Sequence, residues 1–193
     1  KRLKKLLPQH SYITAIDRKH APYGNRSPEE IITLTDAAIQ PLLSCDIIVL
    51  ACNTATTNAI GSLRQRYPDV CFIGFEPMVK SAAALTKSHH ITLLATNATK
   101  QSQRLHTLIN QYASGVHIDT PDTSAWAQMI DQGLADDIVL DEVSTSVADG
   151  SDVIVLGCTH YLALKRRLQR LFPQCRILEP TAIIAKRISD FAS

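Results

Sequence analysis

Two cysteines of this 193-residue chain stand in matching sequence surroundings. Segment 46–56 reads Asp-Ile-Ile-Val-Leu-Ala-Cys-Asn-Thr-Ala-Thr, and segment 152–161 reads Asp-Val-Ile-Val-Leu-Gly-Cys-Thr-His-Tyr. Each pattern predicts a buried strand, then a cysteine (Cys52 or Cys158), then polar residues that open a helix. The N–H groups and positive dipole end of a helix N-terminus lower a thiol pKa. We therefore expect two thiols that ionise readily.

Polar residues beside these cysteines are suited to holding a small anion. Donors that fit a carboxylate follow both thiols, namely Asn53, Thr54 and Thr159. A third polar segment, 17–27, predicts a turn that offers a backbone N–H and a phenol, at Pro22, Tyr23 and Gly24. A single cysteine that ends a strand is often only a small buried hydrophobe. The repeated arrangement favours reactive thiols.

Short β-branched runs and helical patterns alternate along the chain and must position these residues. The runs predict strands at 12–16, 47–51, 70–73, 91–95, 116–118, 153–156 and 176–178. Helical patterns lie at 28–42, 55–67, 79–88, 100–112, 125–132, 136–148, 160–172 and 181–191. Nearly all-apolar strands, each followed by a helix, predict an α/β fold with parallel strands covered on both faces. Segment 1–7 is typical of the end of an amphipathic helix, so the chain is expected to begin within an element.

One helix start is predicted sharply. Ser27 is placed to cap a helix, with Pro28 in its first turn and Glu30 at the third position.

Composition narrows the classes of partner. The chain is 45% hydrophobic and has a formal net charge of +2, so neither nucleic acid nor a membrane surface is an expected partner. No apolar stretch approaches the roughly 18–20 residues of a membrane span. The basic run at 165–170 is at helical spacing and is typical of a solvated face.

The cysteine count argues against two kinds of site. Five scattered cysteines do not suggest a disulfide framework and favour a reducing, cytoplasmic location. Cys158 and His160 have no second close pair to complete a zinc site, so no metal is expected. The remaining cysteines lack polar surroundings and are predicted to be structural, namely Cys45, Cys71 and Cys175.

The three polar segments resemble, in order and spacing, the motifs of glutamate racemases in the aspartate/glutamate racemase family. The matching residues are Ala-Cys-Asn-Thr-Ala at 51–55, Gly-Cys-Thr-His-Tyr at 157–161 and Pro-Tyr-Gly at 22–24. The resemblance continues through Gly-Phe-Glu-Pro at 74–77 with Lys80, and through Leu-Leu-Ala-Thr at 93–96 with Thr99. It covers essentially the whole chain.

The resemblance implies two doubly wound parallel-sheet lobes with the active site in the cleft between them. Residues 1–90 would form the first lobe, to which 180–193 would return, and 91–179 the second. Cys52 would act on D-glutamate and Cys158 on L-glutamate, without pyridoxal phosphate or metal. His160 would assist Cys158.

Further residues take their expected roles from the same resemblance. Substrate-binding residues would be Pro22, Tyr23, Gly24, Asn53, Thr54, Thr96 and Thr159. The small-molecule substrate would be glutamate, and its D-isomer would feed peptidoglycan synthesis.

The sequence departs from the family pattern in two places. The family begins with a strand ending in an Asp-Ser-Gly loop, and this sequence starts downstream of it, as an N-terminally truncated member would. Where the family carries a catalytic glutamate, alignment on Gly133-Leu134 offers the shorter Asp131.

Several alternatives stay open at this point. They are a catalytically silent racemase-like protein, a racemase of aspartate or another acidic amino acid, and a cysteine hydrolase. The hydrolase would pair Cys158 with His160, but side chains two residues apart usually point apart, and Cys52 would have no role. The oligomeric state is open too, a homodimer included.

The two-base hypothesis makes a geometric prediction. Cys52 and Cys158 should face each other at a sulfur–sulfur distance of roughly 6–9 Å, because each reacting pair must approach to about 3–3.5 Å.

Overall fold

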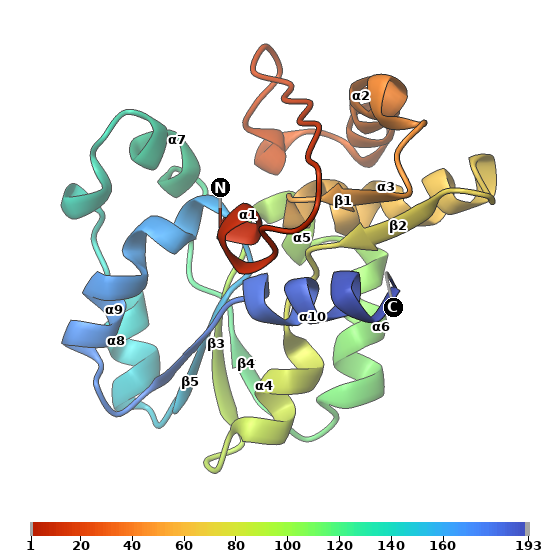
Figure 1. Ribbon diagram of the computed structural model, residues 1–193. Helices are drawn as coiled ribbons and strands as arrows, with labels where there is room; N and C mark the ends of the chain where they lie inside the picture. The colour runs from red at the N-terminus through yellow and green to blue at the C-terminus, as the bar shows by residue number, and fades with distance from the viewer. Residues whose placement is uncertain (1, 192–193) are drawn as a thin grey trace.

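Two parallel sheets form the frame of the protein in a computed structural model that describes residues 2–191 (Figure 1). The smaller sheet pairs β1 (Ile47–Leu50) with β2 (Cys71–Gly74). The larger sheet has the order β4-β3-β5-β6, from β3 (His90–Leu94), β4 (His117–Asp119), β5 (Val153–Leu156) and β6 (Arg176–Leu178). The predicted α/β fold with parallel sheets is confirmed. Three residues of the predicted lobes lie outside the described ones, namely Lys1, Ala192 and Ser193.

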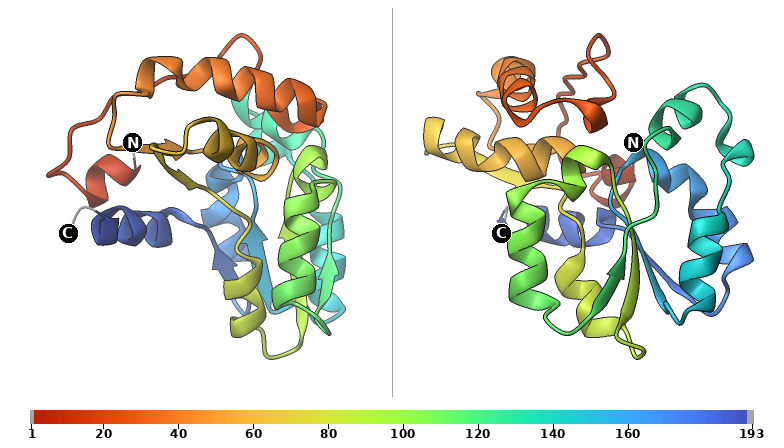
Figure 2. Two further views of the ribbon diagram at one scale, coloured as in Figure 1. Left: turned by 90° about the vertical axis from the view of Figure 1, so that its right-hand side faces the viewer. Right: turned by 180° about the vertical axis from the view of Figure 1, so that it is seen from behind.

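Helices cover both faces of the larger sheet (Figures 1 and 2). One face packs against α4 (Val79–Leu85) and α6 (Gln103–Tyr112), and the other against α7 (Trp126–Asp131), α8 (Asp141–Ala148) and α9 (Lys165–Leu171). Alternate strand side chains supply the two cores, since successive residues of a strand face opposite ways. In β5, for example, Val155 enters the α4/α6 core and Leu156 enters the other.

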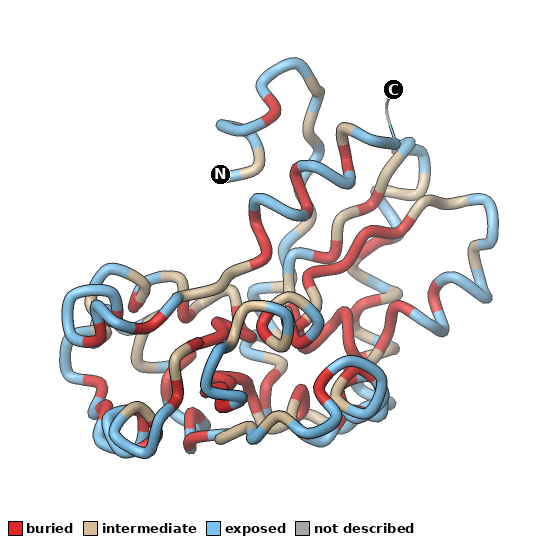
Figure 3. The backbone as a smooth tube through the Cα atoms, turned by 90° about the horizontal axis from the view of Figure 1, so that it is seen from below, coloured by how far each residue is buried: buried red, intermediate tan, exposed pale blue. Residues whose placement is uncertain are grey.

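The smaller sheet is also covered on both faces. Ile48 and Leu50 of β1 pack with α3 (Asn53–Arg66) and α2 (Pro28–Ile39). On the opposite face, Ile73 of β2 packs with Ile184 and Ile188 of α10 (Thr181–Phe191) and with Leu7, which follows α1 (Arg2–Leu6). α10 therefore leaves the end of β6 in one sheet and packs on the other sheet. The buried residues concentrate along the strands and the inner sides of these helices (Figure 3).

The predicted capping box at the start of α2 is confirmed. The Glu30 N–H donates to the Ser27 hydroxyl and the Ser27 N–H donates to the Glu30 carboxylate, both at 3.2 Å. These bonds satisfy N–H groups that the first turn of a helix leaves free.

The strand predicted at 12–16 is wrong. These residues have no regular secondary structure, and Ile13 and Ile16 are each 65% exposed. Tyr12 instead folds back, and its phenol donates to the carbonyl of Leu7 at 2.8 Å. A run of β-branched residues becomes a strand only where a neighbouring strand pairs with it.

Several predicted helices are interrupted or shortened, and three of them begin differently from the prediction. The helix at 100–112 divides into α5 (Asn97–Lys100) and α6, because the Ser102 hydroxyl accepts the Leu105 N–H and starts a new helix. The helix predicted at 160–172 begins as the 3₁₀ helix His160–Leu164 and continues as α9. The helix predicted at 136–148 begins only at Asp141, because residues Ala135–Asp137 form a separate 3₁₀ helix.

Two further properties bear on location and chemistry. Among residues 2–191, no helix has both the length and the apolarity needed to cross a bilayer. The five cysteines are all free thiols.

Candidate active site

Cys52 lies at the N-terminus of α3, directly after β1. It is the N-cap of that helix with an extended backbone, and its sulfur accepts the Ala55 N–H at 3.5 Å. The end of β1 therefore places the Cys52 thiol beside the free N–H groups in the first turn of α3, as the sequence predicts.

Cys158 occupies the corresponding place after β5. Its sulfur lies 3.7 Å from Nδ1 of His160, whose Nε2 lies 3.3 Å from a carboxylate oxygen of Asp131. The expectation that side chains two residues apart would point apart is wrong here, because Thr159 is helical and a 3₁₀ turn follows it. The structure thus lines up a carboxylate, an imidazole and a thiol.

The two thiols are close enough to interact electrostatically. Burial, together with negative charge on Cys52, raises the pKa of Cys158 to about 12. Burial also raises the pKa of Cys52, although N–H groups of Ala55 and Thr54 act against it. The expected lowering of both thiol pKa values is therefore wrong for the protein without substrate. Desolvation of a thiolate outweighs the helix N-terminus.

The raised pKa of Cys158 predicts a loss of stability at alkaline pH. Its contribution is complete below the unfolded-state pKa, near 9, and is lost as the pH rises towards 12, because only the unfolded thiol ionises in that window. The free energy of unfolding should fall by about 1.4 kcal/mol per pH unit for this group. Urea unfolding at pH 8 and pH 10.5 tests this. Cys158→Ser should lose less stability than the wild type or Cys45→Ser, and equal losses would contradict the prediction.

Asn53 is buried beside Cys52 with its side-chain amide unpaired. It is 1% exposed, and neither its amide nitrogen nor its amide oxygen has a hydrogen-bond partner in the structure. Unpaired polar atoms are costly to bury and are rare in folded proteins. The amide therefore offers both a donor and an acceptor to a ligand.

Threonine hydroxyls join the carboxyl ends of the two sheets. The hydroxyls of Thr54, after β1, and Thr96, after β3, share a hydrogen bond of 2.8 Å, and Thr96 donates to Thr99 at 3.1 Å. In the larger sheet the strand order reverses between β3 and β5. Open parallel sheets bind ligands outside the carboxyl ends of the strands at such a reversal. Thr96 and Cys158 both lie there.

The segment Pro22-Tyr23-Gly24 lies against this group. Gly24 approaches so closely that a Cβ on it would lie 3.0 Å from Cβ of Thr96. The Tyr23 phenol donates to Asp17 at 2.8 Å, and Asp17 also pairs with His20 at 2.9 Å. Burial, the Asp17 contact and negative charge on Cys52 all raise the pKa of Tyr23.

Asp17 is a residue that sequence reasoning missed. The sequence places this carboxylate three residues before His20 and six residues before Tyr23. At that spacing one aspartate can bind both side chains and stabilise the turn between them.

The contact of Gly24 with Thr96 predicts a sensitive position. Gly24→Ala should lower the free energy of unfolding by about 1–3 kcal/mol, because the added methyl group overpacks a buried contact. Gly61→Ala is the matched control: nothing lies within 4 Å of its Cβ position inside α3, so the change should stabilise by about 0.5–1 kcal/mol. Chemical denaturation of both variants measures the effect, and a Gly24→Ala protein as stable as wild type would show that the turn can move.

The predicted site residues therefore form two connected groups. The first gathers Tyr23, Gly24, Cys52, Asn53, Thr54 and Thr96, and the second gathers Asp131, Cys158 and His160. Pro22 is exposed at the edge of the first group, and Thr159 is partly exposed at the start of the 3₁₀ turn. Two surface hollows lie elsewhere, one between His20 and α2 and one beside α7 and α8.

The sequence and the fold match known racemases. Residues 1–188 match the family described as Asp/Glu/Hydantoin racemase. Glutamate racemase of Roseiflexus sp. (strain RS-1) is 33% identical over 97% of this chain and 72% of that protein, and that of Haemophilus influenzae is 37% identical over 96% and 72%.

A solved structure gives the same result. The crystal structure of Escherichia coli glutamate racemase in complex with L-glutamate and the activator UDP-MurNAc-Ala superposes with a TM-score of 0.83 at 30% identity. The match covers 98% of this chain and 75% of that one. The chain therefore belongs to the Asp/Glu/hydantoin racemase family, and the relatives named above are glutamate racemases, a class of isomerase.

Proposed function

We propose that the protein interconverts L- and D-glutamate by moving a proton on and off the α-carbon, with Cys52 and Cys158 as the two bases and without a cofactor. The observation that carries this proposal is the pair of thiols, each at a strand end, that interact electrostatically beside the unpaired amide of Asn53. Inverting a stereocentre by proton exchange needs a base on one face and an acid on the other. The names of the relatives indicate glutamate as the substrate.

The proton balance of the proposed reaction is simple. One thiolate removes the α-proton and becomes a thiol, while the opposite thiol protonates the carbanion on its other face and becomes a thiolate. The same pair can then run the reaction in reverse. Cys158 would remove the proton of L-glutamate and Cys52 that of D-glutamate.

Generating the first thiolate is the step that burial makes difficult. The α-ammonium group of a bound amino acid would place a positive charge beside the thiols and lower their pKa values. At Cys158, His160 can accept the thiol proton through Nδ1, and Asp131 can stabilise the resulting imidazolium. The thiols are thus protonated until substrate arrives, which protects them from reaction in its absence.

The remaining residues would orient the substrate in the cleft between the two lobes. Asn53, Thr54 and Thr159 would hold the α-carboxylate and amino groups. A separate set would lie near the side-chain carboxylate, namely Pro22, Tyr23, Gly24 and Thr96. The D-glutamate formed would supply peptidoglycan synthesis in the cytoplasm.

Incubation in D₂O tests the proposal. With L-glutamate, deuterium should enter the α-position as D-glutamate accumulates towards an equal mixture, and circular dichroism follows the change. Faster exchange with L-aspartate would reassign the substrate, and no exchange with either would leave a protein that only binds.

One observation favours a second function. The line Asp131, His160 and Cys158 has the order of a cysteine hydrolase triad, in which the thiolate attacks a carbonyl. A hydrolase leaves Cys52 without a role, and so the racemase is preferred. Formation of an acyl-enzyme on Cys158 from a thioester substrate would reverse that preference.

Asp131 provides a graded prediction. Asp131→Asn should lower kcat/KM about 100-fold, the low end of the range for a general acid–base group, because its side chain is 53% exposed. The loss should be equal in both directions, since the two enantiomers have equal free energy. Asp131→Glu should retain activity, and Asp137→Asn, an exposed carboxylate nearby, is the control. Unchanged kinetics in Asp131→Asn would remove this residue from the catalytic line.

A further inference from the structure

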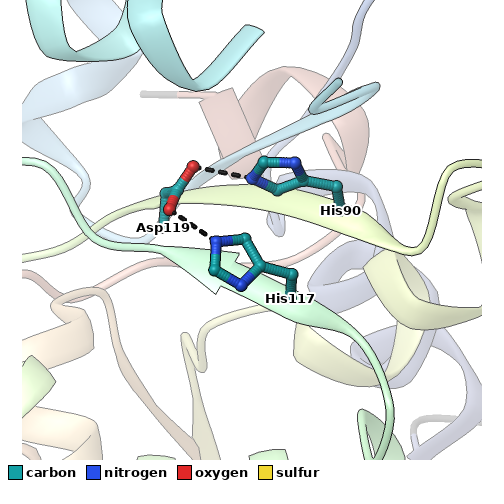
Figure 4. A group of neighbouring side chains, drawn as sticks. All are labelled: His90, His117 and Asp119. Carbon is teal, nitrogen blue, oxygen red and sulfur yellow. Dashed lines mark hydrogen bonds and ion pairs between the residues drawn. The ribbon is translucent and has the colours of Figure 1, made fainter. Parts of the chain in front are cut away.

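Two histidines at the amino ends of β3 and β4 meet an aspartate two residues further along β4 (Figure 4). They lie at the opposite end of the larger sheet from the carboxyl end of β5, which leads to Cys158. The parallel register aligns His90 with His117 and Thr92 with Asp119. Nε2 of His90 lies 2.7 Å from one oxygen of the Asp119 carboxylate, and Nε2 of His117 lies 2.9 Å from the other. The three ligand atoms lie within 4.8 Å of one another.

An outer layer of contacts orients this cluster. Nδ1 of His90 lies 3.3 Å from the backbone carbonyl of Asp149, which would accept a hydrogen bond from this nitrogen when Nε2 binds a metal ion. The Ser146 hydroxyl donates to the Asp119 carboxylate. Ligating histidines typically donate their second N–H to a carbonyl, and ligating carboxylates accept further hydrogen bonds. Both features are present here.

The two imidazoles face one carboxylate from two strands. Nε2 of His90 and Nε2 of His117 lie against different oxygens of Asp119, and the Ser146 hydroxyl donates to the oxygen that faces His90. Imidazole nitrogens and a carboxylate oxygen are ligands of divalent transition metals, so an ion placed among these atoms would be bound by all three side chains.

The geometry is close to that of a metal site. With metal–ligand bonds of about 2.0–2.1 Å, the observed nitrogen–oxygen distances correspond to nitrogen–metal–oxygen angles of about 80–90°. If each nitrogen–oxygen distance increased by about 0.5 Å, these angles would become tetrahedral. His90 is 11% exposed, whereas His117 is 67% exposed, so an ion can enter from solvent and keep water ligands there. Two imidazoles and one carboxylate favour zinc and its transition-metal neighbours over magnesium or calcium.

We propose that His90, His117 and Asp119 bind one divalent transition-metal ion, zinc or a chemically similar ion, at a site separate from the two cysteines. Sequence patterns do not reveal it because His90 is 27 residues before His117 and 29 residues before Asp119, so only the fold brings it to the other two. The ion would tie β3 to β4 and, through Ser146, to α8. It would stabilise the folded chain and take no part in the proton exchange.

Metal titration of the full, metal-free protein tests this proposal. Co²⁺ should bind with one-to-one stoichiometry and give a d–d absorption without a thiolate-to-cobalt charge-transfer band. Zn²⁺ at about 100 times its Kd should raise the Tm by about 5–10 °C. His117→Ala and Asp119→Asn should each weaken binding at least about 10-fold. The matched control is His106→Ala, an exposed histidine on α6, and it should bind as wild type does.

Other outcomes would overturn the proposal. They are an absence of binding, equal binding by His117→Ala, or a charge-transfer band that Cys52→Ser and Cys158→Ser remove. Circular dichroism checks that the variants fold, and anomalous scattering from crystals of the wild-type protein grown with zinc locates the ion if they do not.

Discussion

Cys52→Ser and Cys158→Ser are each expected to abolish racemisation, with kcat lowered by about 1,000-fold or more. A general acid–base group contributes about 10²- to 10⁴-fold, and a serine hydroxyl neither ionises nor donates as readily as a thiol. Each variant should still catalyse one half of the chemistry. With substrate analogues that carry a β leaving group, Cys52→Ser should eliminate from the L-form and Cys158→Ser from the D-form.

The opposite preferences separate a two-base mechanism from general damage to the site. Cys45→Ser and Cys71→Ser are the controls, because these cysteines lie outside both groups of site residues. Near wild-type racemisation by either active-site variant would show that its thiol is not a base.

Asn53→Leu should separate substrate binding from stability. The substitution removes two buried polar atoms that have no partner in the structure, so the free energy of unfolding should stay equal or rise. Activity should fall, because hydrogen bonds to a charged ligand each contribute about 1.5–3 kcal/mol, which corresponds to about 10- to 150-fold in kcat/KM.

The matched control lies one turn further along α3. The amide of Asn58 donates to the Thr54 carbonyl at 2.9 Å, so Asn58→Leu should lower stability. Thermal unfolding and steady-state kinetics of the two variants make the comparison. If Asn53→Leu is less stable and equally active, its amide serves the fold and does not bind substrate.

Local patterns predicted the elements that position the site. The strands leading to Cys52 and Cys158 are entirely apolar, so composition alone identifies them; β5 is buried throughout, and β1 alternates half-buried and buried residues. The capping box at Ser27 could also be predicted from the sequence, because all of its interactions lie within four consecutive residues. The resemblance to a family supplied the residue roles, and these remain proposals.

Features that depend on distant contacts were not predictable. Segment 12–16 has the composition of a strand, but whether it becomes one depends on a neighbour that local sequence does not specify. The predicted lowering of the two thiol pKa values was wrong for a similar reason. Sequence places each cysteine at a helix N-terminus, but the desolvation that dominates comes from packing around both of them. The cluster of His90, His117 and Asp119 likewise exists only through the register of β3 and β4.

The path of α10 has a mechanical consequence for the pair of thiols. Cys52 and Cys158 follow strands of different sheets, so the gap between them is set by how the two sheets are held relative to each other. α10 connects the two sheets, because it follows β6 of one sheet and packs Ile184 and Ile188 against β2 of the other. A small shift of this helix would change the reach of both thiols to one carbon atom without touching either. If the two thiols are the bases of the proposed reaction, we expect substitutions at Ile184 or Ile188, on the far side of the smaller sheet, to change the turnover rate while every reacting group stays in place.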